Sequence, residues 1–303
     1  MYSELIRRTL DSRSVWHSLR QTEEIAWSKA GKDEEEVVKA IWQDLANLRL
    51  QVPVSSPSYS FTLEVRGKGV YVHRHRCNVK DPSFGAEIAD LAIVVDHYVV
   101  LPSQERRLLN TGISMIQAKR MAKLGSGLDP GQLYLMCFWP QLQYKGRMWQ
   151  LPLLRDICAF YLFFHDDRAI SQAQEVGSLV SAQYLADTNG LTEQNLRELI
   201  RRDDNAKVEP DFVRTRPTIN GGAFPLPLGR FLRRALKCYL GCSGLRLREF
   251  FQSAYAPDLF SSPPHPLEAS SSDAPTPKYL GGNEGGYVLR LEVTIRQGER
   301  IRR

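Results

Sequence analysis

The stretch EIADLAIVVDHYVV, residues 87–100, constrains the fold more than any other part of the chain. Its central run LAIVV is continuously apolar, whereas a strand with one face in water alternates apolar and polar residues. A run of this kind is typical of a strand covered on both faces. The sequence therefore predicts a central strand in a sheet that is flanked by helices.

The segments around this strand alternate between helical and extended patterns. Before the central strand we expect helices over residues 12–30 and 33–50 and then a hairpin of YSFTLEV and VYVHRHRC that turns at RGKG. After it we expect a polar loop over residues 102–112, a strand over residues 113–119, a helix stopped by Pro140, and a buried strand in CAFYLFFH. Helices and strands mixed in this order are typical of an α/β fold with a mixed sheet.

The second half of the chain is less regular and richer in helical patterns. LTEQNLRELIRRD and LGRFLRRALKCYLG predict helices, residues 261–278 form a Pro/Ser-rich stretch that predicts a long loop, and YVLRLEVTI alternates as a final strand. We therefore expect a core over residues 1–170 and a C-terminal helical extension over residues 171–303 that ends in a strand.

Charge and composition narrow the class of protein. The formal net charge is +6, which favours a nucleic acid or another polyanion as partner. No apolar run approaches the ~20 residues that a membrane span needs, and the first residues lack the apolar segment of a secretory signal. The five cysteines form no CxxC pair, which predicts reduced thiols. We expect a cytoplasmic protein that does not contact a membrane.

Three polar side chains are expected at the ends of two buried strands. Gln117 and Lys119 lie two residues apart, so they share one face of their strand, and Asp90 directly precedes the apolar run LAIVV. If the two strands pair, a carboxylate, an amide and an ammonium converge. This combination suits Mg²⁺ and a phosphate, because Mg²⁺ takes one or two carboxylates and leaves other positions to water and substrate. The alternative is that both strands simply reach the surface there.

The pattern of EIAD, an apolar strand, a loop, an apolar strand and QAK resembles the PD-(D/E)xK nuclease superfamily. More narrowly, it is similar to the branch with glutamine in the second acidic position, as in Mrr-type restriction endonucleases. The resemblance covers roughly residues 33–165, with the motif in residues 85–121. It implies a restriction-endonuclease-like fold and Mg²⁺ or Mn²⁺ as cofactor. It also implies Asp90 as principal metal ligand, Gln117 as the second, the Ala118 carbonyl nearby, and Lys119 as catalytic lysine.

The sequence departs from that family at two positions. Ala89 stands where the family has a proline, and Gln117 carries no charge, so a further acid is expected at the metal. Glu87, three residues before Asp90, is one candidate. Glu36 in the preceding helix is the other, although a capping box with Asp33 also explains it. Both stay open.

Basic residues that could contact nucleic acid lie in two places. Arg120 directly follows the predicted catalytic lysine. The second place is a stripe at helical spacing, made of Arg230, Arg233, Arg234 and Lys237. Such a stripe suits phosphates, which reward charge without carrying sequence information. The alternative is an ordinary solvated helix surface.

These observations predict a metal-dependent endonuclease that hydrolyses phosphodiester bonds of DNA, with RNA also open as substrate. Since families of this kind supply bacterial defence effectors, an antiviral role is part of the expectation. The alternative is a catalytically weak, nuclease-like subunit that binds nucleic acid and docks on a helicase, an ATPase or a regulatory protein. A third hypothesis is a regulatory or structural protein with no role in nucleic acid.

Overall fold

The structure is a computed structural model. It describes residues 1–29, 34–55, 59–73, 76–120, 127–151, 158–164, 178–202, 207–208, 226–241, 245–260 and 285–300. The Pro/Ser-rich stretch over residues 261–278 lies outside the described residues.

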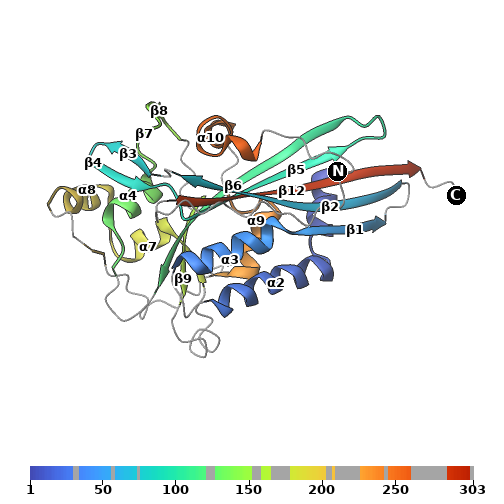
Figure 1. Ribbon diagram of the computed structural model, residues 1–303, viewed down its shortest axis with the longest axis horizontal. Helices are drawn as coiled ribbons and strands as arrows, with labels where there is room; N and C mark the ends of the chain where they lie inside the picture. Colours follow the sequence, from blue (N-terminus) through green and yellow to red (C-terminus); the bar gives the residue numbers. More distant parts are fainter. Residues whose placement is uncertain are drawn as a thin grey trace.

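An eight-stranded mixed sheet forms the centre of the molecule, in the order β1-β2-β12-β5-β6-β9-β10-β11 (Figure 1). Its strands are β1 (Arg49–Ser55), β2 (Tyr59–His73), β5 (Leu91–Val100), β6 (Arg106–Arg120), β9 (Ala159–Phe164), β10 (Ser178–Ser181), β11 (Leu226–Pro227) and β12 (Gly285–Arg300). The pairs β12–β5 and β6–β9 are parallel, and the other pairs are antiparallel. The predicted α/β class with a mixed sheet is confirmed.

The apolar run LAIVV lies in the first half of β5, and every residue of this strand is buried. β12 lies on one side of it and β6 on the other, so the last strand of the chain lies in the middle of the sheet. The boundary expected at residue 170 is therefore not a division of the sheet, because segments from both halves of the chain build it.

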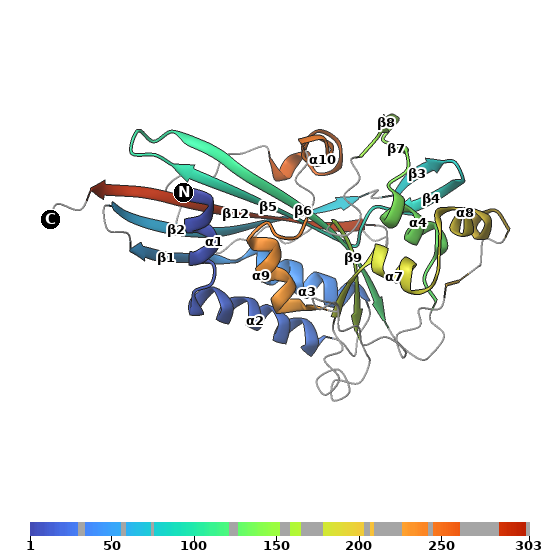
Figure 2. The same ribbon diagram turned by 180° about the vertical axis from the view of Figure 1, so that it is seen from behind.

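Helices cover both faces of the sheet, each over its own apolar cluster (Figures 1 and 2). One face carries α1 (Tyr2–Thr9), α2 (Arg13–Ser28), α3 (Glu34–Ala46) and α9 (Leu228–Leu236). The other carries α4 (Pro130–Phe138), α7 (Ala182–Thr188), α8 (Glu193–Arg202) and α10 (Leu245–Phe250), followed by a π turn (Phe251–Tyr255) and a 3-10 turn (Pro257–Leu259). None of the helices in the described part of the chain combines the length and the apolar character that crossing a bilayer requires.

A second, four-stranded antiparallel sheet lies at the end of the molecule opposite the two chain termini (Figures 1 and 2). Its strands, in spatial order, are β4 (Ser83–Glu87), β3 (Arg76–Lys80), β7 (Leu142–Tyr144) and β8 (Arg147–Trp149). Since β4 ends at Glu87 and β5 begins at Leu91, a three-residue link ending in Asp90 joins the two sheets.

Two sequence-based expectations about this region are wrong. RGKG does not turn, because β2 runs through it without interruption. The glycines serve close packing instead: a Cβ at Gly67 would overlap the Leu45 carbonyl oxygen, and one at Gly69 would overlap the Trp42 indole. The polar segment over residues 102–112 is mostly strand as well, since β6 begins at Arg106 and pairs with β5.

Among the four cysteines that the structure describes, one differs from the expected reduced thiols. Cys77, Cys137 and Cys238 form no disulfide. Cys158 is disulfide-bonded. The sequence could not reveal this, because no CxxC spacing marks the bridge and the pairing depends on the tertiary structure.

Candidate active site

Asp90 is held by both strands that flank β5. Its backbone N–H donates to the Ile116 carbonyl of β6 at 3.0 Å, and its own carbonyl accepts from the Tyr287 N–H of β12 at 2.9 Å. The predicted pairing of the two strands is present, with Leu91 opposite Ile116. The backbone therefore fixes where the Asp90 carboxylate lies.

The carboxylate lies against the end of β6. Oδ2 of Asp90 accepts a hydrogen bond from Gln117 Nε2 and another from the Ala118 backbone N–H, both at 2.7 Å. The Gln117 side chain is buried, and its Oε1 has no hydrogen-bond partner among the described residues. An unsatisfied buried acceptor costs free energy, so this amide oxygen is a candidate ligand for a cation.

Lys119 and the start of α3 meet at the same place. Lys119 Nζ is 3.4 Å from Glu34 Oε2, and the Arg120 backbone N–H donates to Glu34 Oε1 at 2.8 Å. The helix thus contributes a carboxylate beside the lysine, and the residue is Glu34, not the predicted Glu36. Glu36 lies 3.8 Å from Lys39 on the same helix.

A cavity of about 140 Å³ opens between these elements. It is lined by Glu34, Glu35, Val38, Tyr71, Glu87, Asp90, Gly285 and Tyr287. Four of these residues are acids, and Glu35 accepts a hydrogen bond from the Tyr287 hydroxyl at 3.0 Å. The predicted Glu87 lies on this cavity, whereas Glu36 is not among its lining residues.

Sequence reasoning missed Glu34 and Glu35, although a signal for both was present. Val38 is an apolar residue at helical spacing with Ile41, Trp42 and Leu45, and it is buried. Residues three and four positions before Val38 share its helix face, and these are Glu35 and Glu34. Glu36 is rotated about 200° from Glu34 at 3.6 residues per turn, so it faces elsewhere.

The electrostatics of the cavity favour the neutral form of Asp90. Burial raises the pKa of the Asp90 carboxyl to about 7. The Lys119 ammonium and the Ala118 N–H lower this pKa, while the negative charges of Glu87 and Glu34 raise it. A carboxyl with a pKa displaced this far by burial and by other acids is typical of a functional site.

The donor set fits a magnesium or manganese ion. Carboxylate and amide oxygens are the ligands these ions prefer. Asp90 and Glu87 line the cavity, and the Gln117 amide, whose Oε1 has no partner among the described residues, is bonded to Asp90. Among the described residues, no group of three or more His, Cys, Asp or Glu side chains is placed to hold a metal by itself. The ion would therefore need the glutamine, water and substrate oxygens to complete its coordination.

The basic stripe of α9 does not present four free cations. Arg233 and Lys237 both form ion pairs with Asp11, which follows α1. Arg230 is exposed. Two of the four cations therefore connect α9 to the N-terminal part of the chain. For the other two, Arg230 and Arg234, phosphate binding stays a prediction.

No match to the chain is found among protein-family models, curated proteins or solved structures. The feature from which a function can be inferred is accordingly the acidic cavity lined by Asp90 and Glu34, with Gln117 bonded to Asp90 and Lys119 paired with Glu34.

Proposed function

We propose that the protein is a Mg²⁺- or Mn²⁺-dependent nuclease of the PD-(D/E)xK type that hydrolyses phosphodiester bonds of DNA. The observation that carries the proposal is the meeting of Asp90, Gln117 and Lys119 at the joined ends of β5 and β6, beside the acidic cavity. The arrangement around them supports the resemblance. β6 and β9 are parallel neighbours with α4 between them in sequence, and α3 precedes the strands.

Asp90, Glu87 and Gln117 Oε1 would hold the metal. A bound Mg²⁺ or Mn²⁺ polarises a phosphoryl oxygen and lowers the pKa of a coordinated water. Asp90 suits this role because burial, together with the charges of Glu87 and Glu34, raises its pKa to about 7, and a bound cation would favour the ionised form. Its backbone bonds to β6 and β12 keep the carboxylate in one position.

Lys119 would act on the reacting phosphate. Glu34, 3.4 Å from the ammonium, holds it at the end of β6 next to the Asp90 carboxylate. From that position the lysine can neutralise negative charge that develops on the phosphate in the transition state, or orient the attacking water. Glu34 is then a positioning residue, and Lys119 is the catalytic one.

A second candidate function is a nuclease-like subunit that binds nucleic acid and docks on a helicase or ATPase. The specific observation in its favour is that Asp90 Oδ2 already accepts two hydrogen bonds, and that the second acidic place holds the neutral Gln117. Such a site binds metal less strongly than one with two carboxylates. This candidate predicts DNA binding without turnover.

The test is cleavage of labelled DNA and RNA, single- and double-stranded, with Mg²⁺, with Mn²⁺ and with EDTA. We expect the parent protein to cleave DNA with metal only, and Lys119→Ala to lose about 10²–10³-fold in rate, as for other removed transition-state donors. Arg13→Ala is the matched control, because Arg13 is an exposed cation at the start of α2.

Three outcomes separate the candidates. Metal-dependent cleavage that Lys119→Ala abolishes and Arg13→Ala retains supports the nuclease. Binding of DNA with no cleavage in either metal favours the docking subunit. Unchanged turnover in Lys119→Ala contradicts the role given to the lysine.

A further inference from the structure

One face of the four-stranded sheet is polar and open. Along β3, Arg76, Asn78 and Lys80 are exposed, while Cys77 and Val79 between them are buried. The buried side of this sheet packs on α4, where the rings of Phe84 and Tyr134 lie 6.0 Å apart. The two faces of β3 are thus sharply different in character, as expected for a strand with one face in solvent.

Strand pairing extends the open face across the whole sheet. Asn78 is opposite Gly85 on β4 and opposite Gln143 on β7, and Gln143 is opposite Met148 on β8. The row therefore offers two amides and no carboxylate. Gly85 leaves the surface flat, since even an added Cβ would have its nearest neighbour at 3.7 Å.

The same face leads into the candidate active site. Arg76 is paired in register with Glu87, and Glu87 also lines the acidic cavity with Asp90. A strand of nucleic acid lying on this face would pass from cationic and amide side chains directly to the proposed metal ligands.

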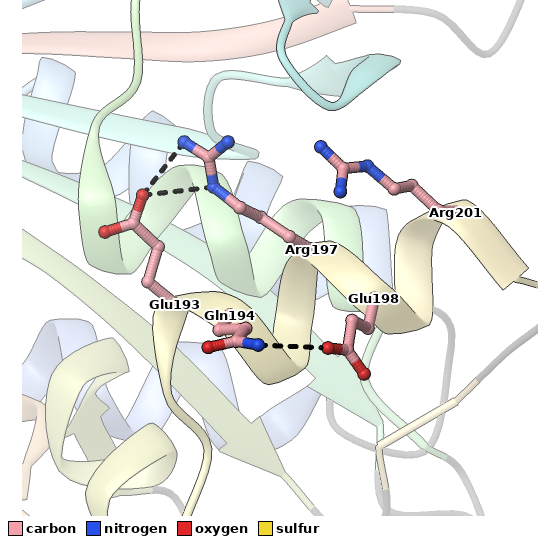
Figure 3. Close-up of a pocket in the computed structure, with 5 residues that line it drawn as sticks. All are labelled: Glu193, Gln194, Arg197, Glu198 and Arg201. Atoms are coloured by element: carbon pink, nitrogen blue, oxygen red, sulfur yellow. Dashed lines mark hydrogen bonds and ion pairs between the residues drawn. The ribbon is translucent and has the colours of Figure 1, made fainter.

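The arginines of α8 differ from the two cations of β3, Arg76 and Lys80, in their partners. A pocket of about 310 Å³ is lined by Glu193, Gln194, Arg197, Glu198 and Arg201 (Figure 3). Each arginine in it is already bound to a carboxylate: Arg197 to Glu193 at 2.9 Å, and both Arg197 and Arg201 to Asp81 at 2.9 and 3.1 Å. A phosphate at this pocket would have to displace existing ion pairs.

Arg76 and Lys80 form no ion pair with any residue that the structure describes. They lie four residues apart on one strand, a separation of about 13 Å at ~3.3 Å per residue. A DNA strand carries one phosphate per ~3.4 Å of duplex axis, so the two cations can contact different phosphates of one strand.

We propose that the open face of the four-stranded sheet is the surface that holds the nucleic-acid backbone, with Arg76 and Lys80 as phosphate contacts and the scissile bond at the Asp90 cavity. This inference rests on the proposed nuclease function and adds the position of the substrate to it. These contacts would depend on charge and not on base sequence, because neither cation has an ion-pair partner among the described residues that would orient it toward a base edge.

The test measures the affinity for duplex DNA at several salt concentrations, in EDTA, with fluorescence anisotropy as the readout. We expect the double variant Arg76→Gln with Lys80→Gln to bind more weakly, and to reduce the slope of log affinity against log salt by about 1.8, at ~0.9 per lost phosphate contact. Arg8→Gln with Arg13→Gln is the matched control, since it removes the same charge from exposed positions of α1 and α2.

A second variant tests whether charge alone matters. Arg76→Lys with Lys80→Arg should keep the affinity and slope of the parent. Equal slopes for the parent and the glutamine variant overturn the inference, as does absence of DNA binding by the parent.

The failure of this inference can be told from failure of the proposed function. If the parent binds DNA with the expected slope but never cleaves it, the nuclease proposal fails and the binding surface stands. If the parent cleaves DNA and the glutamine variant keeps the parent's slope, the binding surface alone fails.

Discussion

Asp90 and Asp96 belong to the same stretch of chain but have opposite surroundings. Asp96, in the middle of β5, is fully buried, and it is 2.8 Å from Arg290 and 3.4 Å from Arg248. Its Oδ1 also accepts from the Thr111 hydroxyl at 2.5 Å. The hydrogen-bond donors that the described residues give the Asp90 carboxylate, just before β5, are both neutral, and acids line the cavity around it.

The two pKa values follow from this difference. Burial raises the pKa of Asp96, but Arg290, the Thr111 hydroxyl and Arg248 together lower it below its usual range. At Asp90 burial prevails and the pKa rises to about 7. A buried carboxylate whose charge the protein itself neutralises stabilises the fold. One whose charge is left to an incoming cation has the character of a site.

The largest change in stability is expected when Asp96, the aspartate whose charge the arginines neutralise, is replaced. Asp96→Asn should lower the free energy of unfolding at pH 7 by about 3–5 kcal/mol, because it leaves two arginines beside a neutral group in a buried region. In the parent, the depressed pKa means that this stabilisation is present above about pH 4 and is lost as the pH falls further. Urea unfolding at several pH values measures both quantities, and a loss below 1 kcal/mol would remove the contrast.

The same change at the other aspartate should have the opposite sign. Asp90→Asn should raise the free energy of unfolding by about 1–2 kcal/mol at pH 8 without metal, since a carboxylate amid other acids disappears. Because the folded pKa is raised, the parent loses stability as the pH rises from about 4 to 7, and the variant should lack this loss.

Asp187→Asn, at an exposed position of α7, is the control for this experiment. A destabilised Asp90→Asn with the same pH dependence as the parent would mean that Asp90 is a structural residue like Asp96.

A smaller effect is expected from adding an acid to the Asp90 region. Gln117→Glu should bind Mn²⁺ about tenfold more tightly, or about 1.4 kcal/mol, because a second carboxylate joins Asp90. Calorimetric titration with Mn²⁺ gives the affinity, and cleavage should be retained. Complete loss of cleavage in this variant would show that the amide of Gln117 has another task.

The smallest effect concerns charges that the fold has already paired at the surface. Arg233→Gln with Lys237→Gln should lower the free energy of unfolding by at most ~1 kcal/mol, as is usual for exposed ion pairs, and should leave the salt dependence of DNA binding unchanged. Thermal unfolding and anisotropy measure the two. A flatter salt dependence would instead assign the α9 stripe to phosphate.

Much of the site was open to prediction because it depends on local periodicity. The continuous apolar run of β5 required burial on both faces, and the alternation of β6 put Gln117 and Lys119 on one side. Once these strands paired, Asp90 had to lie beside the amide. The helices α2, α3, α8 and α9 also followed from spacing, because an amphipathic helix carries its buried stripe in its own residues.

Other features depend on which distant segments meet, and no local pattern contains that information. Arg290 of β12 neutralises Asp96 only because the last strand inserts beside β5, 194 residues away along the chain. Gly67 and Gly69 predicted a turn from the sequence, but in the structure they allow α3 to pack closely against β2. The sequence does not separate these cases, because a glycine is typical of both a bend and a close approach of two backbones. The rotation of α3 about its axis relative to the sheet places Glu34, and not Glu36, beside Lys119 and the cavity. The sequence alone determined which residues face inward in each element, and only the tertiary structure decided which charges those residues meet, because pairing energies act between segments and not along them.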